Sequence, residues 1–599
     1  MKFYLLSVAL LLSASAARAS AAGPEWSTKF DGRVKFYQMT ELGVFVVGTE
    51  KSLYAVDGEG GEILWRRKNA RLDETDVAPI SGTDLVLLSF EKSDRTRFEA
   101  VDLLSGETVW RTDKVNGAPM QMALDLDQNL LAVVVAKKAK GDPKSGFKRK
   151  PVVHVFSLRE GDLLWKREAE REVEMMPARW SGDGDTDYTL DNYHPPLLLD
   201  GRLYLFYEGV VSLDARTGRE RISERYRVNE EGLALTEADP VYDERFIYTS
   251  GRGRVRAVSR DSGRTEWESQ DLGLTPEMLL SGGVLYVRTG GQFTKLENGE
   301  TVNRGDYGVS AIDKRTGKTV WRYKGADKGI TNILLADEST ILLADRDDLI
   351  AVDTRTGKRA SKASHKVSRA AFVLINERGE AVVGGFEEIA AFDTASGRNV
   401  WRARHTPPSR GALRIIAAVA LRAASLYFRY GGIGLAAYRG ARIARAAGSL
   451  RWSGLARATG PGLTSLASNS AREFATSRFT PLGIAARANQ IANARLNPRV
   501  NLSVDVEERL MDRIDPASQM EKLSKLLLQR RRLAALRGDR MYFYTDLKTE
   551  GGKGLAGVNI NTGRTDREIR IPELDDRFVT NELTGRLFTA KGDRLLAYE

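Results

Sequence analysis

A nine-residue phrase recurs through most of this chain: Asp, three residues, Gly, three residues and Trp. It is complete at four places, namely residues 57–65, 102–110, 313–321 and 393–401. Four further copies keep the glycine but change an end residue, and their glycines are Gly161, Gly218, Gly263 and Gly357. Successive glycines lie 45, 55, 57, 45, 54, 40 and 40 residues apart. Spacing in this range indicates a repeat protein, and it constrains the fold more than any other feature.

Each repeat is predicted to contain four short β-strands. In the first repeat these are residues 34–38, 44–48, 53–57 and 62–66, which are rich in apolar residues and are separated by Gly, Asp and Glu. The Asp and Gly of the phrase fall between the last two strands, where Asp accepts backbone N–H groups and Gly adopts a positive φ. The Trp follows on the outer strand, where its ring can fill the space between sheets. Such sheets cannot bury both faces alone, so we expect an all-β propeller.

The phrase, in the form AIDKRTGKTVW, resembles the repeat of pyrroloquinoline quinone (PQQ) enzymes and their cofactor-free relatives in the bacterial outer-membrane β-barrel assembly machinery. The resemblance covers residues 26–401 and 540–599. It implies a PQQ-like β-propeller, for which eight blades are typical. This chain allows up to ten, because a degenerate phrase contains Asn559 and Gly563 and the two chain ends form a split repeat.

The two ends of the chain are expected to pair with each other. Trp26 resembles the end of a repeat that lacks its earlier strands, and the last residues, RLFTAKGDRLLAYE, resemble the start of one. Pairing them closes the ring and removes exposed sheet edges. We therefore expect blades over residues 22–401, and final strands over residues 540–599 that close the ring with the N-terminal strand.

Residues 1–21 are predicted to be a secretory signal peptide. They contain Lys2, an apolar run that is too short to span a membrane, and small residues around Arg18. The protein is therefore expected to be periplasmic or otherwise extracytoplasmic. The chain has no cysteine, so repeat packing must replace disulfides. We also expect that the protein is not a lipoprotein, in contrast to the assembly-machinery propeller.

The repeats stop after Trp401, and a basic segment follows. Between residues 394 and 504 arginine occurs 17 times, lysine is absent, and Glu473 is the one acidic residue. The net charge of +11 is therefore a local property of this stretch. We expect residues 402–539 to form a mainly helical insertion, with a second helical candidate at residues 506–537. The arginines expected to share its polar face are Arg414, Arg422, Arg429, Arg439, Arg442 and Arg445.

Two roles for this insertion stay open. Its arginines can face anionic headgroups or a partner protein, because arginines inside the hydrocarbon layer would be costly. Alternatively, the insertion packs on the propeller with its arginines against acidic loops. Nucleic acid would attract the same charge, but export argues against it.

The resemblance also raises the possibility of a PQQ- and Ca²⁺-dependent dehydrogenase. Enzymes of that kind use a calcium ion, a catalytic Asp, a stacking Trp and usually a vicinal cysteine pair. This chain has no cysteine pair, we can match no residue to the metal ligands or the catalytic Asp, and the recurrent tryptophans already have a structural role. We therefore assign no catalytic or cofactor-binding residue and predict a protein that is not an enzyme.

One acidic loop is a weak candidate for a calcium site. Asp183, Asp185 and Asp187 alternate as at the start of a calcium-binding loop, and Asp191 would be the next ligand. Tyr188 stands where an EF-hand requires Gly, and solvated Asp-rich turns are common. The function expected from the sequence is a non-catalytic propeller scaffold that binds envelope proteins through its loops, with a quinoprotein dehydrogenase as the alternative.

Overall fold

The computed structural model describes residues 23–408 and 534–599 with short gaps. The gaps are residues 41, 74–75, 81–82, 93–94, 137–146, 178–187, 191–192, 221–223, 226–237, 239, 295–300, 328–329, 369, 371, 377, 386, 538–539, 550, 572–577 and 581–585. The predicted signal peptide and most of the predicted insertion therefore lie outside the described residues. In the described part, strands and turns form the structure without an α-helix, and none of it is a helix that could span a membrane.

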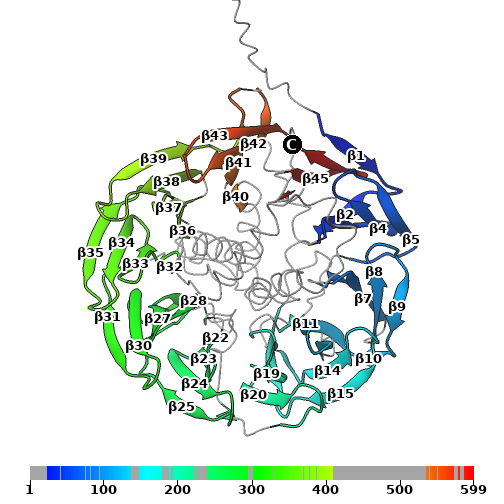
Figure 1. Ribbon diagram of the computed structural model, residues 1–599, viewed down its shortest axis with the longest axis horizontal. Coiled ribbons are helices and arrows are strands. Elements are labelled where there is room, and N and C mark those ends of the chain that lie inside the picture. The colour runs from blue at the N-terminus through cyan, green and yellow to red at the C-terminus, as the bar shows by residue number, and fades with distance from the viewer. Residues whose placement is uncertain are drawn as a thin grey trace, which may run out of the picture.

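Ten four-stranded antiparallel sheets are arranged as the blades of a closed ring (Figure 1). We number the closing blade 1, and within each blade strands a to d run from the centre outward. Blade 2 contains β2 (Val34–Met39), β3 (Val44–Thr49), β4 (Ser52–Asp57) and β5 (Ile63–Lys68). Blade 3 contains β6 (Val77–Pro79), β7 (Leu85–Lys92), β8 (Arg95–Asp102) and β9 (Thr108–Arg111), with β10 (Val115–Asn116) also paired to β8.

The next three blades follow in chain order. Blade 4 contains β11 (Ala118–Asp125), β12 (Leu130–Ala136), β14 (Val152–Ser157) and β15 (Leu163–Glu168). Blade 5 contains β18 (Leu197–Leu199), β19 (Arg202–Leu205), β20 (Gly209–Asp214) and β21 (Glu224–Arg225). Blade 6 contains β22 (Val241–Tyr242), β23 (Phe246–Gly251), β24 (Arg254–Ser259) and β25 (Thr265–Glu268).

Blades 7 to 9 repeat the pattern. Blade 7 contains β26 (Glu277–Ser281), β27 (Val284–Thr289), β30 (Gly308–Asp313) and β31 (Thr319–Tyr323). Blade 8 contains β32 (Ile333–Leu335), β33 (Thr340–Ala344), β34 (Asp348–Asp353) and β35 (Arg359–Ser364). Blade 9 contains β36 (Phe372–Ile375), β37 (Ala381–Gly384), β38 (Glu388–Phe392) and β39 (Asn399–Arg404).

Blade 10 and blade 1 complete the ring. Blade 10 contains β40 (Ala534–Arg537), β41 (Arg540–Asp546), β42 (Lys553–Asn559) and β43 (Thr565–Arg570). Blade 1 combines β44 (Val579–Thr580), β45 (Leu587–Lys591) and β46 (Arg594–Tyr598) with β1 (Trp26–Lys29) from the other end of the chain. The prediction of an all-β propeller is confirmed, and the count of ten holds in place of the eight typical of the family.

The pairing of the two chain ends is confirmed. Strand β1 lies antiparallel to β46, with Trp26 opposite Ala597 and Lys29 opposite Arg594. This pairing gives blade 1 its outer strand. Without β1 the sheet of blade 1 would have only three strands, and with β1 it matches the others.

One segment differs from its prediction. Residues 534–537, the end of the second helical candidate, form β40 and pair with β41. The high helix propensity of AALR is overridden because blade 10 needs an innermost strand, and pairing with β41 satisfies its backbone groups.

Apolar cores lie between neighbouring blades rather than within single sheets. Phe45 and Tyr54 of blade 2, for example, share a cluster with Phe588 and Leu595 of blade 1. The rings of Phe45 and Phe588 are 4.6 Å apart. Each blade is therefore stabilised by both of its neighbours, as in other repeat proteins.

The repeated tryptophan packs on the repeated glycine of the next blade. A Cβ added to Gly106 would lie 2.6 Å from the Trp65 ring, and one added to Gly161 would lie 2.5 Å from Trp110. The same contact joins five further pairs, namely Trp26 with Gly61, Trp165 with Gly218, Trp267 with Gly317, Trp321 with Gly357, and Trp401 with Gly563. Glycine is required there for two reasons: φ is near +70°, and the indole occupies the place of a side chain.

The indole N–H groups add directionality to this contact. The N–H of Trp65 donates to the carbonyl oxygen of Leu103 at 2.7 Å, and that of Trp110 donates to Leu158 at 2.7 Å. Trp165, Trp267 and Trp321 make the equivalent bond. These five tryptophans are therefore both packed and hydrogen-bonded across the seam between two blades.

Blade 8 is one of three blades without the tryptophan, since Ser361 pairs with Ala351 at the place where seven blades have Trp. Gly397 of blade 9 consequently meets only Ala363. A buried amide joins the same two blades: Asn332 donates to the carbonyl of Val373 and accepts from its N–H, both at 2.8 Å.

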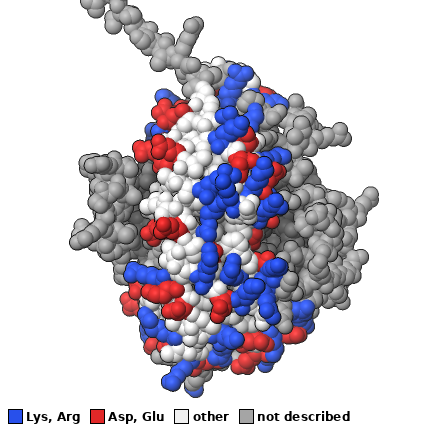
Figure 2. Space-filling view, turned by 90° about the vertical axis from the view of Figure 1, so that its right-hand side faces the viewer, with Lys and Arg blue, Asp and Glu red and all other residues white. Residues whose placement is uncertain are grey.

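The outermost strands carry a recurring surface pattern. Exposed aliphatic residues precede the Trp, among them Leu64, Val109 and Leu164, and basic residues follow it. Figure 2 views part of this rim, where a pale band runs between acidic side chains at its left edge and a column of basic side chains. Some basic residues of the outer strands are paired, since Arg67 and Arg111 both form ion pairs with the buried Glu99.

We predict that the tryptophan contact makes Gly106 far less replaceable than Gly43. Both have φ of +74°, but a Cβ at Gly43 has nothing within 4 Å, whereas one at Gly106 strikes Trp65. Gly43→Ala should cost about 1–2 kcal/mol from backbone strain. Gly106→Ala should cost about 1–3 kcal/mol more, because the indole must move. Thermal unfolding of the two variants measures the difference, and equal losses would contradict the contact.

Candidate interaction face

The ring has two faces that differ in their connections. On one face, the turns between strands c and d lie beside those between strands a and b: Leu103 N–H donates to Asp84 O at 2.6 Å, and Thr354 N–H donates to Ser339 O at 2.8 Å. We call it the turn face. On the other, the end of strand d lies beside the b–c turn, as in the 2.9 Å bond from His365 N–H to Asp347 O. This is the connection face.

Where the long connections leave and re-enter the blades, the described residues lie on the connection face. These connections join strand d to the next strand a, or strand b to strand c, and both kinds meet at the same end of an antiparallel blade. They span residues 137–151, 169–196, 226–240, 290–307 and 405–533. The c–d turns on the opposite face are short in comparison, because the Asp–Gly phrase fixes them.

Two accessory sheets are built from these connections. Strands β13 (Phe147–Arg149), β16 (Val173–Pro177) and β17 (Tyr188–Thr189) form one beside blade 4, and β28 (Gln292–Thr294) and β29 (Thr301–Asn303) form the other at blade 7. Unequal repeat spacing marks these additions, because the glycine gaps of 55, 57 and 54 residues are the ones that contain this structure.

A buried polar network fixes the connection between blades 4 and 5. The side-chain amide of Gln121 donates to the carbonyl oxygens of Leu190 and Tyr193, and its oxygen accepts from the Tyr207 hydroxyl at 2.6 Å. Burial raises the pKa of Tyr207 well above its ordinary value, so this hydroxyl remains a donor. Val173 and Met175 bury their side chains in the same core. The described residues of this connection are therefore anchored to the core between blades 4 and 5.

Close backbone contact fixes the hairpin at blade 7. A Cβ on Gly273 would lie 2.5 Å from the Cα of Gly305, and both residues have a positive φ. Backbone hydrogen bonds continue the contact, from Leu274 N–H to Arg304 O and from Arg304 N–H to Gly291 O. Only glycine permits two chains to approach so closely.

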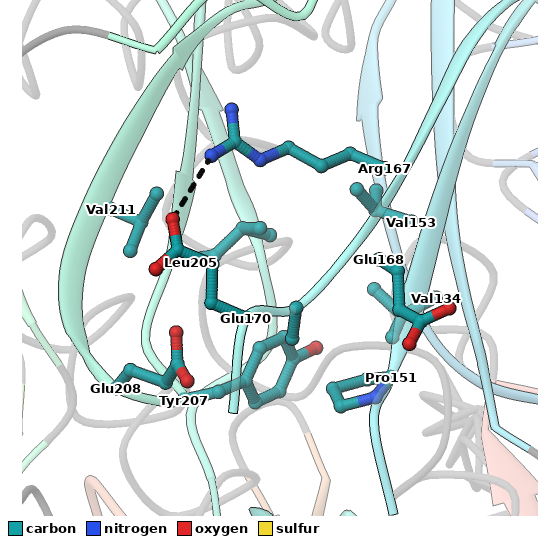
Figure 3. Close-up of a pocket in the computed structure, with 11 residues that line it drawn as sticks. Val134, Pro151, Val153, Arg167, Glu168, Glu170, Leu205, Tyr207, Glu208 and Val211 are labelled. Carbon is teal, nitrogen blue, oxygen red and sulfur yellow. Dashed lines mark ion pairs between the residues drawn. The ribbon is translucent and has the colours of Figure 1, made fainter. Parts of the chain in front are cut away.

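A small pocket opens at the seam between blades 4 and 5 (Figure 3). Val153, Leu205 and Val211 supply an apolar lining with the ring of Tyr207, and carboxylates of Glu168, Glu170 and Glu208 lie around it. Its volume of about 30 Å³ has room for one or two waters or the end of one side chain. Arg167 crosses the seam and pairs with Glu220 of blade 5.

A buried arginine ties blade 7 to blade 8 near the connection face. Arg288 is 1% exposed and donates through Nη1 to the carbonyl oxygen of Ile330 at 2.9 Å. Its Nε lies 3.3 Å from a carboxylate oxygen of Glu277, close enough to pair in charge but without hydrogen-bond geometry. Burial lowers the pKa of Arg288.

The residues predicted to bind ligands or membranes are not among those that the structure describes. The calcium candidates Asp183, Asp185, Asp187 and Asp191 fall in gaps between the described residues. The docking arginines Arg414, Arg422, Arg429, Arg439, Arg442 and Arg445 fall in the gap between residues 408 and 534. Among the described residues, no group of three His, Cys, Asp or Glu side chains is placed to hold a metal ion.

The described residues do not fit a PQQ site. A quinone of this kind needs a free indole face for stacking and ligands for its metal. The seven described tryptophans lie on outer strands, and each indole is committed to the glycine of the next blade. We therefore derive no catalytic step through this group.

Ten blades joined by a tryptophan–glycine contact define a PQQ-like repeat propeller. A family model described as outer membrane protein assembly factor BamB matches residues 13–204, 90–304 and 305–476. The chain belongs to this family.

Solved structures with a similar fold include BamB from Moraxella catarrhalis, with 14% identity and a TM-score of 0.32 over 62% of this chain and 97% of that one. Quinohemoprotein alcohol dehydrogenase from Comamonas testosteroni has 13% identity and a TM-score of 0.28, over 63% and 74%. The scores are low, and the family assignment does not depend on them. No curated protein matches the chain significantly.

Buried histidines should make the propeller sensitive to mild acid. Burial lowers the pKa of His154, His365 and His405 below 6.5. His365 is fully buried; its Nδ1 accepts from Val367 N–H, and its Nε2 lies 3.1 Å from the carbonyl oxygen of Asp345. The unfolded chain therefore binds more protons below pH 6.5, so this contribution to stability is complete above that pH and is lost as the pH falls.

We predict that the free energy of unfolding declines between pH 7 and pH 5, and that replacing the three histidines by Gln flattens the profile. The Asp31 carboxylate affects the free energy of unfolding in a separate and lower pH range. Although burial opposes it, hydrogen bonds from Ser52, Tyr54 and Thr49 lower the pKa of Asp31 to about 2 from 3.8. Urea unfolding across this pH range tests the prediction, and an equally steep profile in the variant contradicts it.

Proposed function

We propose that this protein is an exported, non-catalytic scaffold that binds envelope proteins during outer-membrane protein assembly. One observation carries the proposal: in a member of the BamB family, the described ends of the long connections and the two accessory sheets belong to a single face. Loops held by a rigid scaffold are where binding residues concentrate. The opposite face consists of short turns of nearly constant form.

Recognition without turnover is the mechanism that this arrangement supports. The Gln121–Tyr207 network and the Gly273–Gly305 contact hold two accessory sheets in place before any partner arrives. A preordered surface loses little conformational entropy on binding. The pocket between blades 4 and 5 offers an apolar lining with carboxylates around it, which suits a single aliphatic or basic side chain of a partner.

We infer that the arginine-rich insertion serves the same face. The described start of the insertion lies there: His405 N–H donates to Glu387 O at 2.8 Å, and Thr406 O accepts from the Thr545 hydroxyl at 2.8 Å. The His405 ring stacks on Phe543 at 5.4 Å, so the start of the connection is packed against blade 10. Basic side chains on such a segment would strengthen docking on an anionic membrane surface or an acidic partner.

The test uses the full chain and a variant in which the six docking arginines are replaced by Gln. We expect the full chain to bind the purified barrel-assembly protein of the same organism, or vesicles rich in phosphatidylglycerol. The variant should bind about tenfold or more weakly, because each basic residue near an anionic surface contributes about 1 kcal/mol. Unchanged binding would remove the insertion from the proposal. Failure of the full chain to bind either probe would overturn the scaffold role.

A second variant isolates the connection face. Tyr207→Phe leaves the oxygen of Gln121 unsatisfied and should loosen the connection that ends at blade 5. Tyr242→Phe, at an exposed tyrosine, is its control. Weaker binding to the same assembly protein in the first variant alone would support the assignment of this face, and equal binding in both would contradict it.

The quinoprotein alternative has its own decisive measurement. Adding PQQ and Ca²⁺ to the purified protein should give no bound-quinone spectrum and no dye reduction with alcohols or sugars. Either signal would replace the scaffold proposal with an enzymatic one.

A further inference from the structure

One position of the repeat changes the sign of its charge around the ring. The residue directly after the phrase glycine is acidic in three consecutive blades and basic in the next six. In blades 2 to 4 these residues are Glu62, Glu107 and Asp162. In blades 5 to 10 they are Arg219, Arg264, Lys318, Lys358, Arg398 and Arg564. The charge is therefore segregated by blade, although the turn itself hardly varies.

The structure presents all nine side chains at equivalent places on the turn face. In each turn the residue accepts through its carbonyl oxygen from the N–H at the first position of the phrase, at 2.8 Å in Asp57–Glu62, 2.9 Å in Asp313–Lys318 and 3.0 Å in Asp393–Arg398. The preceding glycine has a φ between +69° and +76° in every case. All nine residues are exposed.

The six basic side chains have no acidic partner among the described residues. Elsewhere in the propeller, basic residues are commonly paired, as Arg167 is with Glu220 and Lys362 is with Asp348. Three further basic residues lie in the same turns and are exposed, namely Arg216, Arg315 and Arg355. Blades 5 to 10 therefore display a row of basic groups along the outer part of the turn face, which we call the basic arc.

The surroundings of the basic arc favour a protein partner over a uniform anionic surface. The a–b turns lie nearer the centre of the same face and contain exposed carboxylates, among them Glu244, Asp337 and Glu338. Glu62 and Glu107 continue the outer ring with the opposite sign. An anionic membrane would approach all of these carboxylates at once. An acidic protein segment can follow the arc and avoid them, since complementary potentials select orientation as well as partner.

We propose that the turn face is a second docking surface, which binds an acidic segment of a partner protein along the basic arc of blades 5 to 10. The acidic residues of blades 2 to 4 repel the same segment and so fix where it ends. This inference rests on the charge arrangement and not on the proposed function of the connection face. Long-range attraction of this kind mainly raises the association rate and weakens as salt is added.

The test compares two fourfold charge reversals in the full chain. One changes the basic arc through Arg219→Glu, Arg264→Glu, Lys318→Glu and Lys358→Glu. Its control makes the same change in net charge at exposed lysines that the structure places elsewhere, through Lys51→Glu, Lys68→Glu, Lys92→Glu and Lys114→Glu. The probe is a fluorescent poly-L-glutamate peptide at low salt. Thermal unfolding checks that both variants fold.

We expect the arc variant to bind the peptide about tenfold more weakly than its control. In the unmodified chain, carbodiimide should cross-link the peptide to Lys318 and Lys358 in preference to Lys68 and Lys92. This preference would show that the peptide binds at the basic arc and not at the arginines of residues 409–533. Equal binding by the two variants, or cross-links without this preference, would overturn the proposal. The proposal would also be overturned if the arc variant lost binding to phosphatidylglycerol vesicles but still bound the peptide as well as its control does. A lipid surface would then be the ligand.

Discussion

The contact between a tryptophan of one blade and a glycine of the next is the interaction on which the rest of the structure depends. It occurs at seven seams and combines a buried aromatic ring with a backbone position that only glycine can occupy. Because the two partners belong to different repeats, neither blade is complete alone. Stability is thereby distributed around the ring as a series of nearest-neighbour terms. The seam at Gly397 shows the rule by exception, since Asn332 supplies a polar bridge where the tryptophan is missing.

The parts of this fold that could be predicted from sequence are those set by local chemistry. The Asp–Gly turn, the alternation of apolar strands and the Trp after each turn are all encoded within about ten residues. They sufficed to predict the blades and the joining of the chain ends, and they allowed a number between the eight blades typical of the family and ten. The accessory sheets depend instead on contacts between distant segments, such as Gln121 with Leu190 and Tyr193. Residues 534–537 were predicted as helix because propensity was the only guide, and pairing with β41 decided otherwise.

In a repeat of this kind, the two faces of the ring differ in which features can vary from blade to blade. On the turn face, the Asp–Gly phrase fixes the backbone, so variation is confined to side chains at set positions. At one of these positions the sign of the charge changes between blades 4 and 5. On the connection face, length itself varies, and whole sheets have been added. The turn face therefore varies in charge, and the connection face varies in shape. The family shares a common scaffold, and the individual loops and charges distinguish this member.

Strand β1 has a consequence for how the protein reaches its final state. It makes up one quarter of blade 1, and its partner β46 lies at the opposite end of the chain. Protein synthesis begins at the N-terminus, so Trp26 and its neighbours must wait for almost the entire polypeptide before they can pair. Until then blade 2 presents an uncovered apolar flank that would adhere to other chains. Once the two ends meet, opening the ring at this point requires losing that pairing together with the seam between blades 1 and 2. Closure therefore separates an aggregation-prone precursor from a kinetically stable product.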